Sequence, residues 1–259
     1  MGAEASLVEI FVSAQGEGPE VGRTTVFVRF GGCDLRCGWC DSPGTWRPGA
    51  VCRLEVEAGR GVFEERANPL PIDVVVEHIE RLAPRRSTWI SLTGGEPLLQ
   101  PDAVEAVVDR LHAAGRRIYL ETHGLHAAAL ARMVERIDLV SMDWKLASDV
   151  QWGPRVTPLP GEDFHDAHAA FLRVARRARA VYVKVVVTPS TRDAELDAML
   201  DRIAAIDPST PLVIQPVTPT GSVRERPDAD RLLGWLARAE SRLADVRLVP
   251  QTHPIYGAR

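Results

Sequence analysis

Three of the four cysteines in this 259-residue chain stand close together, at Cys33, Cys37 and Cys40, with the spacing C-x₃-C-x₂-C. Thiolates are soft ligands that suit zinc and iron–sulfur clusters. Zinc needs four ligands, and the chain lacks the second closely spaced cysteine pair of typical zinc motifs, although Cys52 or a histidine could complete the set. A four-iron cluster held by only three thiolates would leave one iron open to another molecule. The spacing therefore predicts a metal centre and favours a cluster, with zinc as the alternative.

Composition excludes several other classes of protein. Hydrophobic residues make up 45% and charged residues 25% of the chain, and the net charge is −4 without a long run of one sign. This balance gives no reason to expect binding to nucleic acid or to an anionic membrane. No stretch approaches the roughly 18 apolar residues of a membrane helix. The N-terminus lacks a signal-peptide pattern, so we expect a cytoplasmic protein with reduced thiols.

Strand-like runs alternate with helical patterns from about Arg23 onward, which predicts a parallel sheet in an open, partly closed or fully closed form. Two segments interrupt the alternation, a long excursion at Ser42–Asn68 and a proline-containing loop at Trp152–Glu162, and we expect a single domain over residues 1–259. The predicted strands are 24–30, 89–92, 117–120, 137–142, 181–187, 212–215 and 246–249. The predicted helices are 72–82, 104–111, 125–136, 165–178, 193–206 and 228–243.

Polar residues follow most of the predicted strands directly. In parallel α/β folds, ligands bind at the carboxyl ends of the strands, so these residues are expected to meet at one rim. They are the cysteine loop, Gly94-Gly95-Glu96, Glu121-Thr122-His123, Ser141-Met142-Asp143, Gln215-Pro216 and Gln251-Thr252-His253.

The cysteine loop, followed by Gly94-Gly95-Glu96-Pro97 after the next strand, resembles the radical S-adenosylmethionine (SAM) superfamily. Further segments make the chain similar over nearly its whole length to the 7-carboxy-7-deazaguanine synthase (QueE) family. These segments are Ser13–Gly18, Phe27–Cys33, Trp39–Ser42 and Gln251–His253. The resemblance implies a partial parallel β/α barrel of the radical SAM type.

The resemblance also implies the roles of individual residues. Cys33, Cys37 and Cys40 would bind a [4Fe–4S] cluster, and Cys52 would be a bystander. Ser42 stands where the family usually has threonine, so a Mg²⁺ ligand is retained there in weakened form. The implied SAM site comprises Trp39, Asp41, Gly95, Glu96, Glu121, Ser141, Asp143, Lys145 and Gln215, with Glu96 bracing its turn. The implied substrate site comprises Ala14, Gln15, Gly16, Glu17, Arg29, Thr93 and His253.

The implied reaction begins when the reduced cluster cleaves SAM to a 5′-deoxyadenosyl radical. That radical removes a hydrogen from C6 of 6-carboxy-5,6,7,8-tetrahydropterin, and ring contraction with loss of ammonia gives 7-carboxy-7-deazaguanine for 7-deazapurine (queuosine-type) biosynthesis. An electron donor such as flavodoxin or ferredoxin and a homodimer are expected by the same analogy. The alternatives are another small radical SAM enzyme, such as a glycyl-radical-enzyme activase, and a zinc-binding interaction module.

Overall fold

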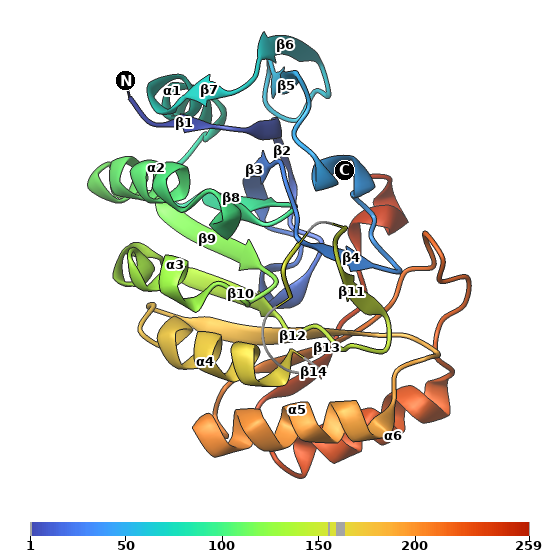
Figure 1. The fold of residues 1–259 in the computed structure, drawn as a ribbon. Helices are drawn as coiled ribbons and strands as arrows, with labels where there is room; N and C mark the ends of the chain where they lie inside the picture. Colours follow the sequence, from blue (N-terminus) through green and yellow to red (C-terminus); the bar gives the residue numbers. More distant parts are fainter. Residues whose placement is uncertain (1, 155, 159–163, 259) are drawn as a thin grey trace.

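The computed structural model describes residues 2–154, 156–158 and 164–258, and its main feature is a ten-stranded sheet (Figure 1). From one edge inward, its parallel part runs β14, β13, β12, β10, β9, β8 and β3. Their bounds are β3 (Thr24–Phe30), β8 (Trp89–Gly94), β9 (Arg117–Thr122), β10 (Leu139–Asp143), β12 (Val181–Val187), β13 (Leu212–Pro216) and β14 (Val246–Leu248).

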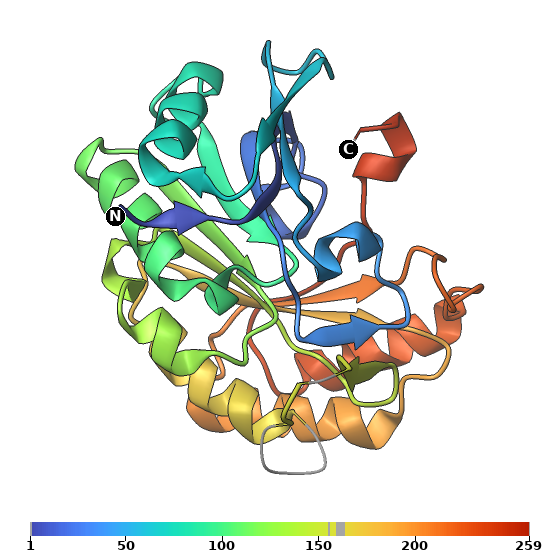
Figure 2. The same ribbon diagram turned by 45° about the horizontal axis from the view of Figure 1, so that its top comes forward.

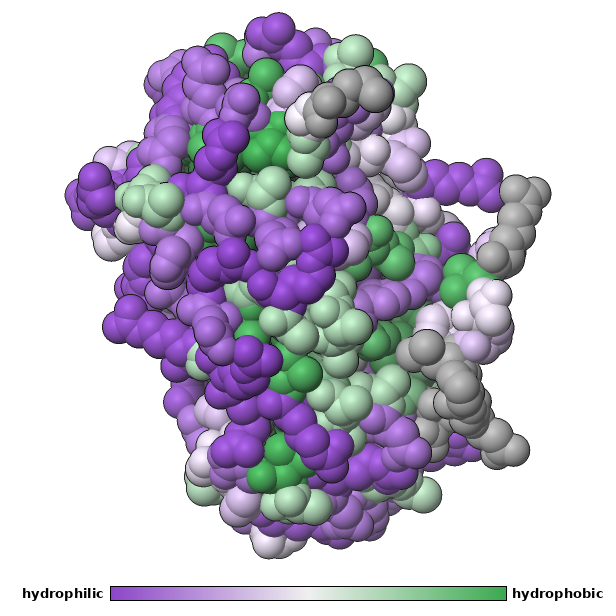
Figure 3. Space-filling model, turned by 60° about the vertical axis from the view of Figure 1, so that its left-hand side comes forward, coloured by the Kyte–Doolittle hydropathy of each residue, from purple (hydrophilic) through white to green (hydrophobic). Residues whose placement is uncertain are grey.

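Helices follow these strands and cover the outer face of the sheet (Figure 2). They are α1 (Ile72–Leu82), α2 (Pro101–Ala113), α3 (Ala127–Ala131), α4 (His165–Ala175), α5 (Asp193–Ile206) and α6 (Ala229–Glu240). In α1, Ile72, Val75, Ile79 and Leu82 recur at helical spacing and are buried, because this stripe faces the sheet. On the side where α2 and α3 lie, hydrophilic residues dominate the surface, with hydrophobic residues between them (Figure 3).

The sheet is curved but open, and within the described residues its edges, β14 and β6 (Phe63–Ala67), do not pair. This confirms the predicted partial barrel. The core lies between the parallel strands and the helices, as strand β12 illustrates. Its sequence VYVKVVV is almost entirely buried, which is typical of a parallel strand covered on both faces.

The N-terminal part of the sheet is not among the predicted elements. Strand β2 (Leu7–Ala14) pairs antiparallel with β3, and β5 (Val51–Glu55) then pairs in parallel with β2. Because β5 and β6 form an antiparallel pair, the excursion at Ser42–Asn68 is more regular than its composition indicates. The predicted helix 125–136 is wrong in extent, since the backbone leaves helical geometry at Met133 before the short 3₁₀ turn η4 (Val134–Arg136).

Two small strand pairs complete the fold: β1 (Glu4–Ala5) with β7 (Leu70–Pro71), and β4 (Leu35–Cys37) with β11 (Val150–Trp152). The second pair ties the cysteine loop to the segment after β10. Residues 155 and 159–162 of the predicted loop Trp152–Glu162 lie outside the described residues. The remaining 3₁₀ turns are η1 (Gly18–Glu20), η2 (Pro43–Trp46), η3 (Pro97–Leu99) and η5 (His253–Tyr256). No helix in the described part of the chain is long and apolar enough to cross a membrane.

Candidate active site

A cavity of about 600 Å³ lies at the carboxyl ends of the parallel strands. Every strand from β3 to β13 in the parallel part of the sheet sends at least one side chain to its wall, from Arg29 on β3 to Gln215 on β13. All but one of the predicted site residues line it. They are Ala14, Gln15, Gly16, Glu17, Arg29, Cys33, Cys37, Trp39, Cys40, Asp41, Ser42, Thr93, Gly95, Glu121, Ser141, Asp143, Lys145, Gln215 and His253.

Glu96 is the exception, because it is fully buried behind the cavity wall. Its carboxylate accepts hydrogen bonds from the Leu98 amide at 2.9 Å, from the Thr122 hydroxyl at 2.9 Å and from the His123 amide at 2.9 Å. With its oxygens taken up in this way, the side chain braces the loops after β8 and β9. These hydrogen bonds agree with the expected bracing role of Glu96, whose side chain does not itself line the cavity.

Steric crowding explains why residue 95 is a glycine, independently of the close approach to SAM that was expected from the sequence. A Cβ at this position would lie 2.1 Å from the carbonyl oxygen of Gly32 in the cysteine loop. The main-chain amide of Gly95 donates to Phe30 at 3.0 Å, and that of Glu96 donates to Gly32 at 2.8 Å. The loops after β3 and β8 thus pack backbone against backbone, which only a residue without a side chain permits.

The three thiols of the cysteine loop suit a metal cluster. Burial raises the pKa of Cys33 to about 12 and also raises the pKa values of Cys37 and Cys40, so the free thiols hold their protons at neutral pH. Such thiols become anionic when a metal centre supplies the compensating positive charge. Cys52 takes no part in this group, because it lies on β5 and its side chain is buried in the main core, away from the cavity.

Four charged side chains form a compact network at the cavity wall. Lys184 on β12 contacts Glu17 at 2.5 Å and Asp143 at 3.3 Å, and Lys145 contacts Asp143 at 2.6 Å. Burial raises the pKa of Asp143, but the two lysine ammonium groups outweigh it and hold that pKa below its usual range. Burial likewise raises the pKa of Glu17, and Lys184 outweighs it. Both carboxyl groups are therefore ionised acceptors.

Two buried oxygens at this wall have no hydrogen-bond partner among the described residues, Oδ1 of Asp143 and Oε1 of Gln215. Leaving a buried acceptor unpaired costs about 1–3 kcal/mol, so native proteins rarely keep one without a reason. Acceptors that face a cavity fit a ligand that carries hydroxyl or amino donors, as SAM does. The predicted SAM positions at the ends of β10 and β13 are compatible with this cosubstrate.

The part of the wall next to this network is also polar. The side-chain amide of Gln15 donates through its nitrogen to Glu121 at 3.1 Å and accepts through its oxygen from the main-chain amide of Glu17 at 3.1 Å. Arg29 forms an ion pair with Glu9 at 3.1 Å while both residues line the cavity. Burial, together with the nearby Glu17 charge, raises the pKa of Glu121.

The C-terminal segment closes one side of the cavity. The amide side chain of Gln251 donates to Glu17 at 2.6 Å and to Asp41 at 3.2 Å, and the Thr252 main-chain amide donates to Gly16 at 2.9 Å. A Cβ on Gly16 would lie 2.3 Å from Nδ1 of His253, so the missing side chain makes room for the imidazole.

Sequence reasoning missed several wall residues, of which Lys184 is the most informative. A lysine in the middle of an otherwise apolar strand is a signal that could have found it, because a buried charge needs a partner. Further polar wall residues that sequence reasoning did not single out include Glu9, Thr45, Arg53 and Thr218. Thr122, His123 and Gln251 also line the wall, as expected for residues at this rim.

The fold and the cysteine loop together point to a class of protein, and comparisons with known proteins agree. The sequence model of the Radical SAM superfamily matches residues 27–204. The crystal structure of QueE from Escherichia coli superimposes with a TM-score of 0.61 over 96% of this chain and 95% of that one. Its sequence identity of 22% makes it a likeness of fold alone.

Proteins of similar sequence identify the family within this superfamily. The 7-carboxy-7-deazaguanine synthase of Geobacter sulfurreducens is 38% identical over 260 residues, which cover 98% of this chain and 97% of the relative. The synthase of Methanopyrus kandleri is 34% identical over 253 residues, covering 96% and 92%. The chain therefore belongs to the radical SAM superfamily and, within it, to the family of the 7-carboxy-7-deazaguanine synthases.

Proposed function

We propose that this chain is a 7-carboxy-7-deazaguanine synthase, a carbon–nitrogen lyase that converts 6-carboxy-5,6,7,8-tetrahydropterin to 7-carboxy-7-deazaguanine with loss of ammonia. The observation that carries the proposal is that a single cavity is lined both by the three cysteine thiols and by ionised and unpaired acceptors. Full-length similarity to synthases of this name supports the same reaction.

Cys33, Cys37 and Cys40 would hold the [4Fe–4S] cluster that the superfamily uses, and SAM would lie beside them. When bound, this pair supplies a carbon radical that removes a hydrogen atom from the substrate. Asp143 and Gln215 would accept hydrogen bonds from SAM through their unpaired oxygens. Trp39 would pack near SAM, and its ring lies 5.8 Å from the Lys145 ammonium. Asp41, Gly95, Glu121, Ser141 and Lys145 complete the lining of the proposed SAM site, and Glu96 braces its turn.

The substrate's two ends differ in chemistry, and so do the side chains proposed to bind them. Glu17 is ionised and can accept from the N–H groups of an aminopyrimidinone ring. The Arg29 guanidinium can bind the substrate carboxylate at two points. Ala14, Gln15, Gly16, Thr93 and His253 complete the proposed substrate site.

We also propose that Mg²⁺ binds between Ser42 and the substrate carboxylate. The Ser42 hydroxyl lines the cavity and donates to Asp41 at 2.9 Å, so a carboxylate is available beside it. Mg²⁺ takes few protein ligands and keeps several waters, which suits a site with one hydroxyl and substrate oxygens. Bound there, the ion would fix the orientation of the substrate and act as a Lewis acid.

Three further features belong to the proposal. An electron donor such as flavodoxin or ferredoxin is needed to reduce the cluster. A cytoplasmic location would keep the cysteine thiols reduced and able to bind iron. A homodimer is proposed by analogy with the family, and a single domain over residues 1–259 is proposed because no linker divides the alternation of strands and helices.

The deciding experiment is anaerobic turnover of the reconstituted protein with SAM, a reductant, Mg²⁺ and 6-carboxy-5,6,7,8-tetrahydropterin, followed by mass spectrometry. We expect 7-carboxy-7-deazaguanine and 5′-deoxyadenosine, and loss of both in Cys33→Ala, Cys37→Ala and Cys40→Ala variants. SAM cleavage without the deazaguanine product would instead indicate another radical SAM activity, such as a glycyl-radical-enzyme activase. Bound zinc without sulfide would overturn the radical mechanism altogether.

A further inference from the structure

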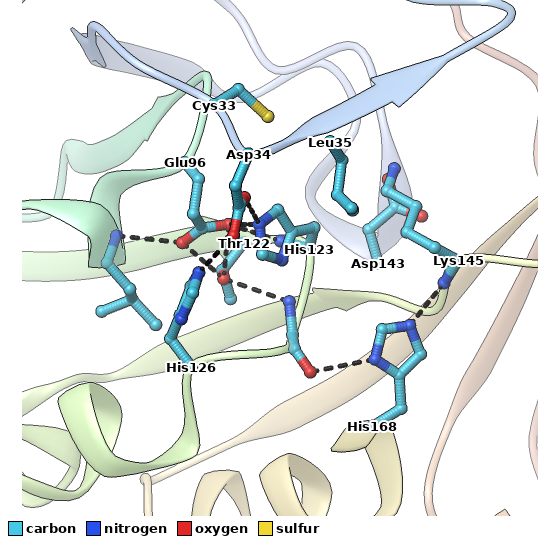
Figure 4. Close-up of polar contacts among 12 residues, drawn as sticks. Cys33, Asp34, Leu35, Glu96, Thr122, His123, His126, Asp143, Lys145 and His168 are labelled. Atoms are coloured by element: carbon cyan, nitrogen blue, oxygen red, sulfur yellow. Dashed lines mark hydrogen bonds and ion pairs between the residues drawn. The ribbon is translucent and has the colours of Figure 1, made fainter. Parts of the chain in front are cut away.

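A buried carboxylate stands directly beside the first cysteine and is not used by the proposed reaction. Asp34 follows Cys33, and its side chain is only 8% exposed. One oxygen of this carboxylate, Oδ1, lies 2.7 Å from Nε2 of His123, and the other, Oδ2, lies 2.9 Å from Nε2 of His126 (Figure 4). Both oxygens thus have a histidine partner, and we call these three residues the Asp34–histidine clamp.

The clamp joins the cysteine loop to another loop of the site. His123 and His126 belong to the segment between β9 and α3, which follows the strand that carries Glu121. Behind the clamp, Glu96 accepts from the His123 amide at 2.9 Å, and its own amide donates to Gly32 at 2.8 Å. The loops after β3, β8 and β9 are therefore connected by hydrogen bonds on both sides of Cys33.

Asp34 faces away from the reacting groups. It does not line the main cavity, whereas Asp34 and His126 both line a second hollow of about 460 Å³ on the outer side of the cysteine loop. Cys33 borders both spaces. The loop is therefore a thin wall between two spaces, and the clamp spans it: Asp34 and His126 line the second hollow, whereas His123 lines the main cavity.

A buried carboxylate without a partner costs free energy, and this cost favours the hydrogen bonds between Asp34 and the two histidines. A contact of this kind fixes its own backbone and hence the direction of the neighbouring side chain. Partners behind metal ligands act in this way, and their loss typically weakens metal binding about 10–100-fold.

We propose that Asp34 is a positioning residue that, through His123 and His126, holds the Cys33 thiol toward the cavity so that the cluster is retained. The proposal rests on the proposed function only in that Cys33, Cys37 and Cys40 bind the cluster. Cys33, Asp34 and His123 also offer ligand atoms within 4.8 Å of one another. A single metal ion at these three residues is the competing interpretation, although the carboxylate is already engaged by both histidines.

The test compares reconstituted Asp34→Ala, Asp34→Asn, His126→Ala and Asp34→Ala/His126→Ala proteins with the unmodified chain. The measurements are iron, sulfide and zinc content, the rate of iron release to a chelator, and the electron paramagnetic resonance spectrum of the reduced cluster with and without SAM. Circular dichroism of the cluster-free proteins checks that each variant is folded. Cys33→Ala serves as the reference for a lost ligand.

We expect Asp34→Ala to release iron about tenfold faster or more and to broaden the spectrum, in line with the loss of a partner behind a metal ligand. Asp34→Asn should restore most of the retention, because an amide can still accept from one histidine and donate to the other. The double variant should behave like Asp34→Ala, since His126 acts through the same carboxylate. His126 is partly exposed, so His126→Ala provides a readout even where Asp34→Ala folds poorly.

Equal release rates for Asp34→Ala and the unmodified chain would overturn the inference, as would fully additive effects in the double variant. Zinc bound in an Asp34-dependent manner would favour the single-ion site instead. In each of these cases Cys33→Ala would still lose the cluster if the proposed function is right. Failure of the clamp is therefore distinguishable from failure of the proposed function.

Discussion

The buried charges at the cavity are arranged around Glu17, which interacts with residues from three other parts of the chain. Lys184 on β12 pairs with one of its oxygens, while Gln215 on β13 and Gln251 near the C-terminus donate to the other. Burial alone would raise the pKa of this carboxyl, and the lysine reverses the effect. Lys184 thus keeps Glu17 in the ionised form that can accept N–H donors.

Replacing Lys184 by methionine tests this arrangement. Burial of Glu17 would then be opposed mainly by the hydrogen bond from Gln251 and would raise its pKa, so substrate binding should weaken as the pH falls through that raised value and recover as the pH rises. We expect the substrate KM at neutral pH to increase about tenfold or more, a loss of roughly 1.4 kcal/mol in binding, with a smaller effect on kcat. The measurement is KM against pH.

Lys184→Arg is the matched control, because it keeps the charge and should keep a nearly unmodified pH profile. A methionine variant whose KM rises equally at every pH would show that the lysine acts by shape alone. The Lys184→Met protein should also have a lower free energy of unfolding than the unmodified chain, since breaking a buried ion pair costs about 3–5 kcal/mol.

At the scale of elements, the loops after β3 and β8 pack closely against each other because residues 94 and 95 are glycines. Gly94 has a φ of 130°, which side chains rarely adopt, and Gly95 has no space for a Cβ beside the Gly32 carbonyl. Glu96 then turns its carboxylate behind both loops. These neighbouring residues therefore join two strand ends into one rigid rim.

A Gly95→Ala substitution should separate these loops, because the clash is with backbone atoms that cannot rotate away. We expect the free energy of unfolding to fall by about 1–3 kcal/mol and the iron content after reconstitution to fall with it. Gly234→Ala is the control. It lies within α6 with nothing inside 4 Å of the added Cβ, and it should stabilise the protein by about 0.5–1 kcal/mol. Retention of full iron content by Gly95→Ala would contradict the role assigned to this contact.

On the scale of the whole molecule, the cysteine loop packs separately from the main core. Leu35, Leu125, Val150 and Phe164 form a small hydrophobic group beside the cysteines. The main core includes residues of the helices and the central strands and contains none of Cys33, Cys37 and Cys40. The scaffold and the site are therefore stabilised by different contacts.

Removal of the cluster by chelation should then loosen the site without unfolding the chain. We expect hydrogen exchange to accelerate in residues 31–46 and in the loop after β9, while β8, β9, β10 and β12 stay protected. The measurement is hydrogen exchange with mass spectrometry on the reconstituted and chelated proteins. Accelerated exchange throughout the central strands would show instead that the cluster holds the fold together.

The sequence predicted the parallel half of the molecule well because its signals are local. Each central strand is a short apolar run, and strand β3 was bounded correctly at both ends. Strands β5 and β6 were missed because their sequences carry charged residues. In addition, β5 pairs with β2, which lies more than forty residues earlier in the chain. Such pairing leaves little trace in the local pattern.

The amino-acid sequence by itself determined the cysteine spacing, the alternation of strands and helices, and the polar residues at the strand ends that meet in one cavity. Only the tertiary structure decided which of these residues touch. It set Lys184 against Glu17, 167 positions away, and His123 against Asp34, 89 positions away. It also set the carboxylate of Glu96 against the Leu98 and His123 amides, which gives the expected bracing role its contacts. Periodicity and spacing act over a few neighbouring residues, whereas buried charges find their partners through the packing of distant segments.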